Sequence, residues 1–300
     1  MSVKKESMEE GRVGKGTTGF SGLKKEQLAT FKEQGFLVLD NFVPEHVIQS
    51  MISRANDIVD EFTEPESLSV FSTRNQKSDQ YFLDSANGVH VFFEEGALDD
   101  TGHLQKPKEV AINKIGHAMH DVIPEFRDWA RSEHVKRLLQ SLGYQKPLPV
   151  QSMYIFKQPK IGGEVVPHQD GCFLATEPQS VVGLWIALED ASVLNGCLWG
   201  LRGSHTNGIH KRFVRSKEDN SVSFEGELPE YDLESFTPLE VPRGSLVLLH
   251  GANVHFSKEN TSEKSRHAFS VHYVEGGEGY TYLDDNWLQR RPDFPFKPLV

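Results

Sequence analysis

The sequence predicts a mainly β fold with flanking helices, in which a helical first half leads into a barrel or jelly-roll core. Helix-like segments concentrate before residue 148, and short β-branched or aromatic segments follow it, separated by glycine, proline and asparagine turns. Many short strands at such spacing are typical of barrels and jelly rolls. Nothing between residues 143 and 149 resembles a flexible linker. We therefore expect one domain over 24–300, with helices mostly in 24–147 and the β core mostly in 148–290, after a disordered tail at 1–23.

Amphipathic patterns define the helices of the first half. In 24–35, Leu28 and Phe31 are spaced as on one helical face, and a glycine stands where helices commonly end. The segment 44–62 opens with proline, a common first helical residue, and carries one continuous apolar stripe. Patterns of this kind predict helices over 24–35, 44–62, 112–122 and 133–143, and strands over 36–43, 70–73 and 89–95.

Short segments of the second half predict the strands of the core. Each is rich in β-branched or aromatic residues, and turn residues such as Asn195-Gly196 separate them. The predicted strands cover 149–158, 181–191, 244–251, 252–258 and 266–275.

Composition argues against several classes of function. The formal net charge is −11, whereas general nucleic-acid binding needs a positive field over a broad surface. No apolar run approaches the ~20 residues of a membrane span, and the first residues lack the apolar segment of a signal peptide. The cysteines, Cys172 and Cys197, fit a reducing compartment, and the final KPLV is not a peroxisomal signal. We expect a cytoplasmic monomer that acts on a small molecule, with no nucleic-acid or membrane partner.

The stretch GGEVVPHQDGCF, residues 162–173, places His168 and Asp170 two positions apart. Residues i and i+2 of a strand point to the same face, so the imidazole and the carboxylate are aimed at one point. That point could hold a divalent metal. For an H-x-D pair taken alone, a hydrogen-bonded His–Asp pair is the better explanation, so the metal interpretation depends on a third ligand.

His250 and His255, in LLHGANVHFSK, are the candidates for that third ligand. Two histidines and one carboxylate, with coordination positions left open, are typical of non-haem Fe(II) oxygenases. Both histidines stand near predicted strand ends, and their positions alone do not separate them.

The residues after His255 favour it over His250. A symmetrical hairpin over 255–266 would set His255 directly across from Arg266, and Ser257 would share its face. A dicarboxylate that chelates the metal at one end could then offer its other carboxylate to the guanidinium and the hydroxyl, which describes 2-oxoglutarate. The alternative for Arg266 is a surface salt bridge with Glu259 or Glu263.

Several motifs give the chain a resemblance to the phytanoyl-CoA dioxygenase family of Fe(II)/2-oxoglutarate oxygenases, over about residues 24–290. They are INKIGHA (112–118), QSMYIFKQP (151–159), GGEVVPHQD (162–170), GLWIALEDA (183–191), NGCLW (195–199), GSH (203–205), HG-x₃-H (250–255) and SRHAFSVH (265–272). The resemblance implies a double-stranded β-helix (a jelly-roll, cupin-like core). It also implies a catalytic centre in which His168, Asp170 and His255 bind the metal.

The same resemblance implies a 2-oxoglutarate site. Arg266 and Ser257 would hold its distal carboxylate, and Lys114, Met153 and Trp185 would line the pocket. Taken without the resemblance, Lys114 is a solvated helix lysine, and the other two are core residues. The implied reaction uses O₂, with ascorbate in support, and couples 2-oxoglutarate decarboxylation to hydroxylation of a small organic substrate, with a branched acyl-CoA such as phytanoyl-CoA as a candidate.

Two rival functions remain open on the sequence. One is a cupin enzyme that uses zinc or manganese on the same ligands for non-oxidative work, and the other is a catalytically silent 2-oxoglutarate sensor. Two sequence features bear on the substrate. Arg202 replaces the proline usual in the family and would add charge near the mouth of the site. The basic segment HKRFVRSK (210–217) is either a solvated loop or a surface that steers an anionic substrate toward the site.

Overall fold

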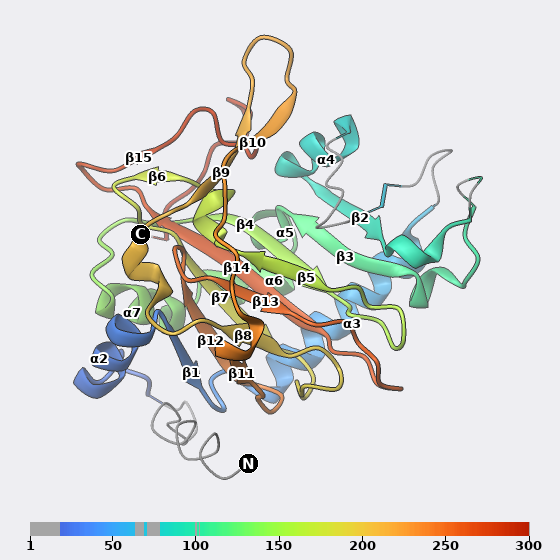
Figure 1. The fold of residues 1–300 in the computed structure, drawn as a ribbon, viewed down its shortest axis with the longest axis horizontal. Helices are drawn as coiled ribbons and strands as arrows, with labels where there is room; N and C mark the ends of the chain where they lie inside the picture. The colour runs from blue at the N-terminus through green and yellow to red at the C-terminus, as the bar shows by residue number, and fades with distance from the viewer. Residues whose placement is uncertain (1–18, 64–68, 71–78, 100, 102, 300) are drawn as a thin grey trace.

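Two antiparallel sheets form the centre of the molecule (Figure 1). The computed structural model describes residues 19–63, 69–70, 79–99, 101 and 103–299. The large sheet has the order β1-β12-β7-β14-β4-β3-β2. Its strands are β1 (Phe36–Leu39), β2 (Val89–Phe93), β3 (Ile112–His117), β4 (Pro147–Ile155), β7 (Val182–Ala187), β12 (Leu246–His250) and β14 (Ala268–Glu275). The fold is mainly β with flanking helices, as the sequence predicts.

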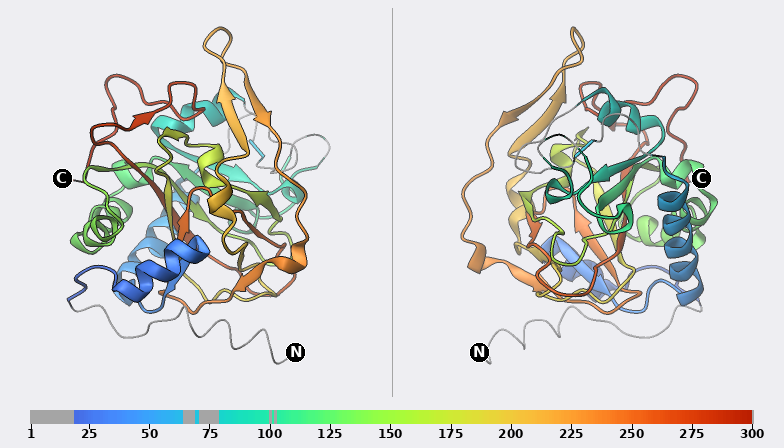
Figure 2. Two further views of the ribbon diagram at one scale, coloured as in Figure 1. Left: turned by 60° about the vertical axis from the view of Figure 1, so that its left-hand side comes forward. Right: turned by 90° about the vertical axis from the view of Figure 1, so that its right-hand side faces the viewer.

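The small sheet packs against one face of the large one and has the order β11-β8-β13-β5. It contains β5 (Val165–His168), β8 (Leu198–Gly200), β11 (Thr237–Leu239) and β13 (His255–Ser257). Two further strand pairs are β9 (Lys211–Arg215) with β10 (Val222–Gly226), and β6 (Thr176–Glu177) with β15 (Thr281–Tyr282). The β9–β10 hairpin projects from the body of the protein (Figures 1 and 2).

Helices cover the face of the large sheet that points away from the small one (Figure 2). They are α2 (Lys25–Gln34), α3 (Glu45–Glu61), α5 (Met119–Val122), α6 (Pro124–Ala130) and α7 (Glu133–Ser141). The short helix α4 (Gln80–Asp84) belongs to a separate buried cluster with Phe92 of β2. The helices predicted over 24–35, 44–62 and 133–143 are confirmed, and α2 ends at Gly35, whose φ of +81° is the left-handed conformation that glycine adopts at helix ends. No described helix is long and apolar enough to span a membrane.

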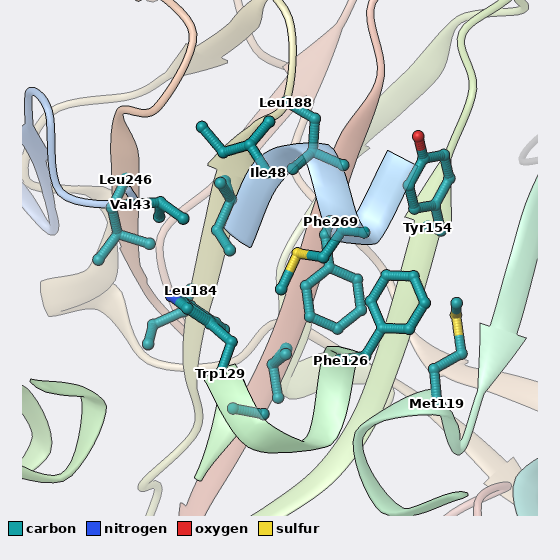
Figure 3. Close-up of a cluster of buried hydrophobic side chains, with 14 of the residues drawn as sticks. Val43, Ile48, Met119, Phe126, Trp129, Tyr154, Leu184, Leu188, Leu246 and Phe269 are labelled. Atoms are coloured by element: carbon teal, nitrogen blue, oxygen red, sulfur yellow. The ribbon is translucent and has the colours of Figure 1, made fainter. Parts of the chain in front are cut away.

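The strands of the large sheet are buried on both faces. Successive residues point alternately toward the helices and toward the small sheet. In β14, Phe269, Val271 and Tyr273 pack against the helices, together with Phe126 and Trp129 of α6 (Figure 3). The intervening Ser270 and His272 point to the opposite face, toward the small sheet. The helical layer therefore supports the sheet from behind and leaves its other face available for polar side chains.

One predicted helix is wrong. Residues 112–122 form strand β3 over Ile112–His117, and only Met119–Val122 are helical. The reason is tertiary pairing, because β3 lies between β2 and β4 and is hydrogen-bonded to both. Gly116 sits close enough to the neighbouring strand that a Cβ there would lie 3.4 Å from the Ser152 carbonyl oxygen. Lys114 is therefore a strand residue and not a solvated helix lysine.

The predicted hairpin over 255–266 is also wrong. Its first strand, β13, pairs with β5 and β8 in the small sheet, whereas β14 pairs with β4 and β7 in the large one. The chain thus crosses from one sheet to the other, and Asn260 anchors the crossing by donating to the backbone carbonyls of Lys157 and Lys264. Of the strand predicted over 70–73, Val70 forms a bridge with Phe93, and the rest lies outside the described residues, as do residues 1–18 of the predicted tail.

Candidate active site

A cavity of about 670 Å³ lies between the inner faces of the two sheets. Its lining includes all eight residues that the sequence singled out, which are Lys114, Met153, His168, Asp170, Trp185, His255, Ser257 and Arg266. They come from strands of both sheets and from the loops that follow them. The structure therefore brings the whole predicted set to one place.

His168, Asp170 and His255 form the one group of potential metal ligands in the described residues, with ligand atoms all within 4.8 Å of one another. His168 ends β5, Asp170 opens the turn that follows, and His255 begins β13. The Nε2 atoms of both histidines lie 3.7 Å from Oδ1 of Asp170. The three side chains thus surround a common point at the edge of the small sheet.

Backbone hydrogen bonds orient the two imidazoles. Nδ1 of His168 lies 2.9 Å from the Val166 carbonyl oxygen, and Nδ1 of His255 lies 3.1 Å from the Asn253 carbonyl oxygen. A proton on each Nδ1 would serve these carbonyls and leave each Nε2 with a lone pair toward Asp170. Burial, together with the neighbouring His255, lowers the pKa of His168 to about 4, so its imidazole is neutral at pH 7.

Asp170 is held from its other side by His272 of β14. Burial would raise the pKa of Asp170, but His272, His255 and His168 outweigh it and hold that pKa below its usual range. Nε2 of His272 lies 3.2 Å from Oδ2 of Asp170, which leaves Oδ1 toward the other histidines. Gly183 permits this approach, because a Cβ there would lie 3.0 Å from Oδ2 of Asp170.

Arg266 is 1% exposed and stands in the loop that leads into β14. Its Nε donates to the Gly196 carbonyl oxygen at 3.2 Å, and its guanidinium lies 5.1 Å from the centre of the Trp185 ring. Its Nη1 is buried and has no hydrogen-bond partner in the described residues. Burial lowers the pKa of Arg266 to about 10, so it remains charged at neutral pH. The surface salt bridge with Glu263 is not formed, because Glu263 pairs with Lys160.

Lys114 and Met153 lie side by side on the inner face of the large sheet, with Nζ 3.9 Å from Sδ. Lys114 is 4% exposed, and burial lowers its pKa to about 7. Ser270 is paired with Met153 on the neighbouring strand, and its buried Oγ lacks a hydrogen-bond partner in the described residues. The inner face of the large sheet therefore presents polar groups, Lys114 and Ser270, to the cavity.

Of the two candidate histidines, His255 lines the cavity and His250 does not. His250 ends β12, and its imidazole packs against Phe31 and His205, outside the lining of the main cavity. Arg202 also lies elsewhere than expected: it is exposed, and its Nε donates to Oγ1 of Thr237, so it does not line the cavity. The charge near the mouth that the sequence predicted from Arg202 is thus not found there.

The basic segment 210–217 lies on the projecting hairpin, and two of its four basic side chains form ion pairs. Arg212 forms an ion pair with Asp285, and Lys217 forms one with Asp284. Arg215 donates to the side-chain oxygen of Asn220. Of the four basic side chains, Lys211 alone lines the cavity.

Sequence reasoning missed Lys157, which also lines the cavity. The signal was present, because Gln151, Met153 and Ile155 alternate along β4 and all line the cavity, and Lys157 continues the same spacing. Sequence reasoning also did not count His272 of β14 among the site residues. Its alternation with Ser270 along β14 could have placed both at the site.

The donor set is chemically suited to a divalent metal and an anionic ligand. Two imidazoles and one carboxylate on adjoining backbone segments are a common iron-binding combination. The cations Arg266 and Lys114, buried a short way along the same cavity, can accept carboxylates of a ligand that reaches the metal. This arrangement permits a metal and a small dicarboxylate to bind side by side.

Comparison with known sequences places the chain in a family. The sequence profile described as phytanoyl-CoA dioxygenase (PhyH) matches residues 31–268. A phytanoyl-CoA dioxygenase of Arabidopsis thaliana is 48% identical over 277 residues, which cover 92% of this chain and 96% of the relative. Phytanoyl-CoA dioxygenase domain-containing protein 1 of Bos taurus is 47% identical over 287 residues, with 92% and 98% of the two chains covered.

Solved structures share the fold at lower identity. The α-ketoglutarate-dependent carbocyclase SnoK of nogalamycin biosynthesis superposes with a TM-score of 0.61 at 19% identity, covering 94% of this chain and 99% of its own. EctD from S. alaskensis, solved with 2-oxoglutarate and 5-hydroxyectoine, gives 0.58 at 14% identity, with 87% and 79% covered. They confirm the predicted double-stranded β-helix core. On its sequence, the chain belongs to the phytanoyl-CoA dioxygenase family and is a non-haem iron- and 2-oxoglutarate-dependent dioxygenase.

Proposed function

We propose that His168, Asp170 and His255 hold Fe(II), and that the chain couples 2-oxoglutarate decarboxylation to hydroxylation of a small organic substrate. The observation that carries this proposal is the convergence of the three side chains on one point of a deep cavity. A simple His–Asp pair would not need a second histidine on the neighbouring strand. The carboxylate of Asp170 also favours hydroxylation over halogenation, because it occupies the coordination position that a halide would need.

The cavity fits 2-oxoglutarate as well as the metal. The unpartnered Nη1 of Arg266 is a buried donor that a ligand carboxylate would satisfy. Ser257, close to the metal ligands on β13, adds a hydroxyl, and Lys114, Met153 and Trp185 form the surrounding walls. We propose that Arg266 and Ser257 hold the distal carboxylate.

Iron and 2-oxoglutarate, when bound, would allow O₂ to carry out the oxidation: one oxygen atom would enter succinate as 2-oxoglutarate loses CO₂, and the other would convert a C–H bond to C–OH. The protein supplies position. The Val166 and Asn253 carbonyls keep the two imidazoles turned toward the metal position, and His272 keeps Asp170 turned toward it. Asp170, His255 and Arg266 are buried between the two sheets, and burial strengthens charged contacts because it lowers the local dielectric constant.

For the substrate we propose an apolar chain attached to an anionic group, with a branched acyl-CoA such as phytanoyl-CoA as the candidate. Aromatic side chains form part of the cavity lining, where Phe82 stacks on Trp287 with ring centroids 4.3 Å apart and Phe173 meets Phe224 at 6.1 Å. Half-buried Lys211 lies 3.6 Å over the Phe224 ring at the same wall. The names of the Arabidopsis and bovine relatives point to the same class of substrate.

The test is product analysis with Fe(II), 2-oxoglutarate, O₂ and ascorbate supplied. We expect succinate, and mass spectrometry should detect a product with one added oxygen atom among acyl-CoAs, free fatty acids and extract metabolites. Turnover supported by zinc or manganese but not by iron would favour the non-oxidative cupin enzyme. Binding of 2-oxoglutarate without product from any of these substrates would favour the sensor.

A further inference from the structure

Lys157 is a buried lysine in the lining of the cavity. It follows β4, is 2% exposed, and adopts a φ of +42°, which L residues adopt at a cost. Its Nζ donates to Oγ of Ser257 at 2.9 Å and to the Gly163 carbonyl oxygen at 2.6 Å. An ammonium has three N–H donors, so these two contacts leave one more available for a ligand.

Lys157 and Arg266 flank the same backbone position. A Cβ at Gly196 would lie 2.6 Å from Cε of Lys157, so only glycine fits there, and the carbonyl oxygen of Gly196 accepts from Nε of Arg266. Ser257, which Lys157 contacts, lines the cavity with both cations. Two positive side chains and one hydroxyl therefore gather around one corner.

Glu94 lies near this corner but does not pair directly with Lys157. Burial and the neighbouring Arg266 together lower the pKa of Lys157 to about 7, while Glu94, Glu164 and Cys197 act in the opposite direction. Oε2 of Glu94 accepts from the backbone N–H of Gly163. Within the described part of the chain, no carboxylate forms an ion pair with Lys157. Two buried cations that lack a directly paired counter-ion are costly, and a bound anion would offset that cost.

We propose that Lys157 acts with Arg266 as a second cation for the distal carboxylate of 2-oxoglutarate, and so determines the preference for a dicarboxylate. The inference rests on the proposed function of the cavity and extends it to a residue of the QSMYIFKQP motif (151–159) to which the family resemblance gave no role. Arg266 offers its unpartnered Nη1, and Lys157 offers its third N–H. One carboxylate, with two oxygens, can accept from both.

Calorimetry on the Fe(II)-loaded protein under argon tests this with 2-oxoglutarate and 2-oxopentanoate. Both probes chelate through the same 2-oxo acid group, but only 2-oxoglutarate has a distal carboxylate. In Lys157→Met, we expect the affinity for 2-oxoglutarate to fall roughly 10- to 150-fold, because a charge-assisted hydrogen bond contributes about that much. The affinity for 2-oxopentanoate should not change. Lys160→Met is the matched control, because Lys160 is an exposed lysine of the same loop that pairs with Glu263.

Proton uptake during 2-oxoglutarate binding gives a second measurement. Replacing a lysine with a purely structural role would not change the number of protons taken up. With a pKa of about 7, Lys157 is mostly neutral at pH 8, and a bound carboxylate favours its charged form. Calorimetry of 2-oxoglutarate binding in buffers of different ionisation enthalpy should therefore show uptake of protons by the wild type. Lys114, whose pKa is also lowered to about 7, can contribute as well. The Lys157→Met variant should take up about one proton fewer at pH 8.

The outcomes separate cleanly. An equal loss of affinity for both probes would mean that Lys157 only braces Ser257 and Gly163, and it would overturn the inference, as would no loss for either probe. If the methionine variant does not fold, Lys157→Gln keeps a donor for those two contacts without the charge and carries the same comparison. A wild-type protein that fails to bind 2-oxoglutarate in the presence of iron would instead overturn the proposed function itself.

Discussion

His255 lies directly across from His168, because β13 and β5 pair antiparallel and these residues are register partners. Their imidazole centroids are 4.3 Å apart, and each Nε2 lies 3.7 Å from the same oxygen of Asp170. The position of the donor set is therefore a consequence of sheet pairing, with two side chains on adjacent strands and the third in the next turn. A rigid backbone of this kind holds ligands in place before a metal binds.

The first prediction separates His255 from His250. Replacing His255 by alanine should abolish tight Fe(II) binding and 2-oxoglutarate turnover, because one of three proposed ligands is lost. His250→Ala should retain both, since that imidazole packs against Phe31 and His205 instead. Anaerobic Fe(II) titration and succinate assays measure the two effects. Full activity in the His255 variant would show that another residue is the third metal ligand.

The second prediction concerns Arg266. Arg266→Ala should weaken 2-oxoglutarate binding by ~2–4 kcal/mol, or roughly 30- to 1,000-fold, because a charge-assisted contact in a desolvated site is lost. Iron affinity should hardly change, since the guanidinium is not a proposed ligand. The KM for 2-oxoglutarate and an Fe(II) titration test the two statements, with Arg127→Ala, an exposed arginine paired with Asp128, as the control. An unchanged KM would refute the role.

The candidate ligands could be predicted from the sequence because their chemistry is local. His168 and Asp170 are two residues apart, and the turn after β5 preserves their proximity. The partner of His255 could not be predicted in the same way. A hairpin is the simplest pairing for a strand, a polar turn and a strand, but here the two strands join different sheets. The hairpin argument was wrong, although it selected the histidine that does lie beside His168 and Asp170.

Burial explains the other differences between expectation and structure. The spacing of apolar residues in 112–122 resembles a helix, and only pairing with β2 and β4 makes Lys114 a buried strand residue. Lys157 was missed because a lysine after a strand is ordinarily solvated. Its place in the cavity depends on Gly196, which is distant in sequence. Contacts between residues this far apart in the sequence cannot be predicted from the spacing of neighbouring residues.

The third prediction concerns His272. Among the ion pairs of the described residues, His272 pairs with Asp170 and with neither of the other proposed ligands. Removing the group that orients a metal-binding carboxylate typically costs about 10- to 100-fold in metal affinity. We expect His272→Ala to lose Fe(II) affinity in that range, as measured by anaerobic calorimetry, and His272→Gln to recover part of it through its amide N–H. Undiminished iron binding in the alanine variant would mean that other contacts suffice to orient Asp170.

The last prediction narrows substrate steering to Lys211. The hypothesis drawn from the sequence used all four basic residues of 210–217, but Arg212 and Lys217 are paired with aspartates, and Lys211 alone of the four lines the cavity. Lys211→Glu should therefore lower kcat/KM for a CoA-bearing substrate by roughly 3- to 30-fold at low salt.

Lys217→Glu makes the same change of charge outside the cavity and should have little effect. The loss in Lys211→Glu should shrink with added salt, because the Debye length falls from ~10 Å at 0.1 M to ~3 Å at 1 M. Uncoupled decarboxylation of 2-oxoglutarate should stay at the wild-type rate, since Lys211 stands at the aromatic wall beside Phe224 and makes no recorded contact with the proposed metal ligands. If Lys211→Glu processes the substrate as fast as the wild type at low salt, the substrate carries no anionic group at this wall, or it enters from another side.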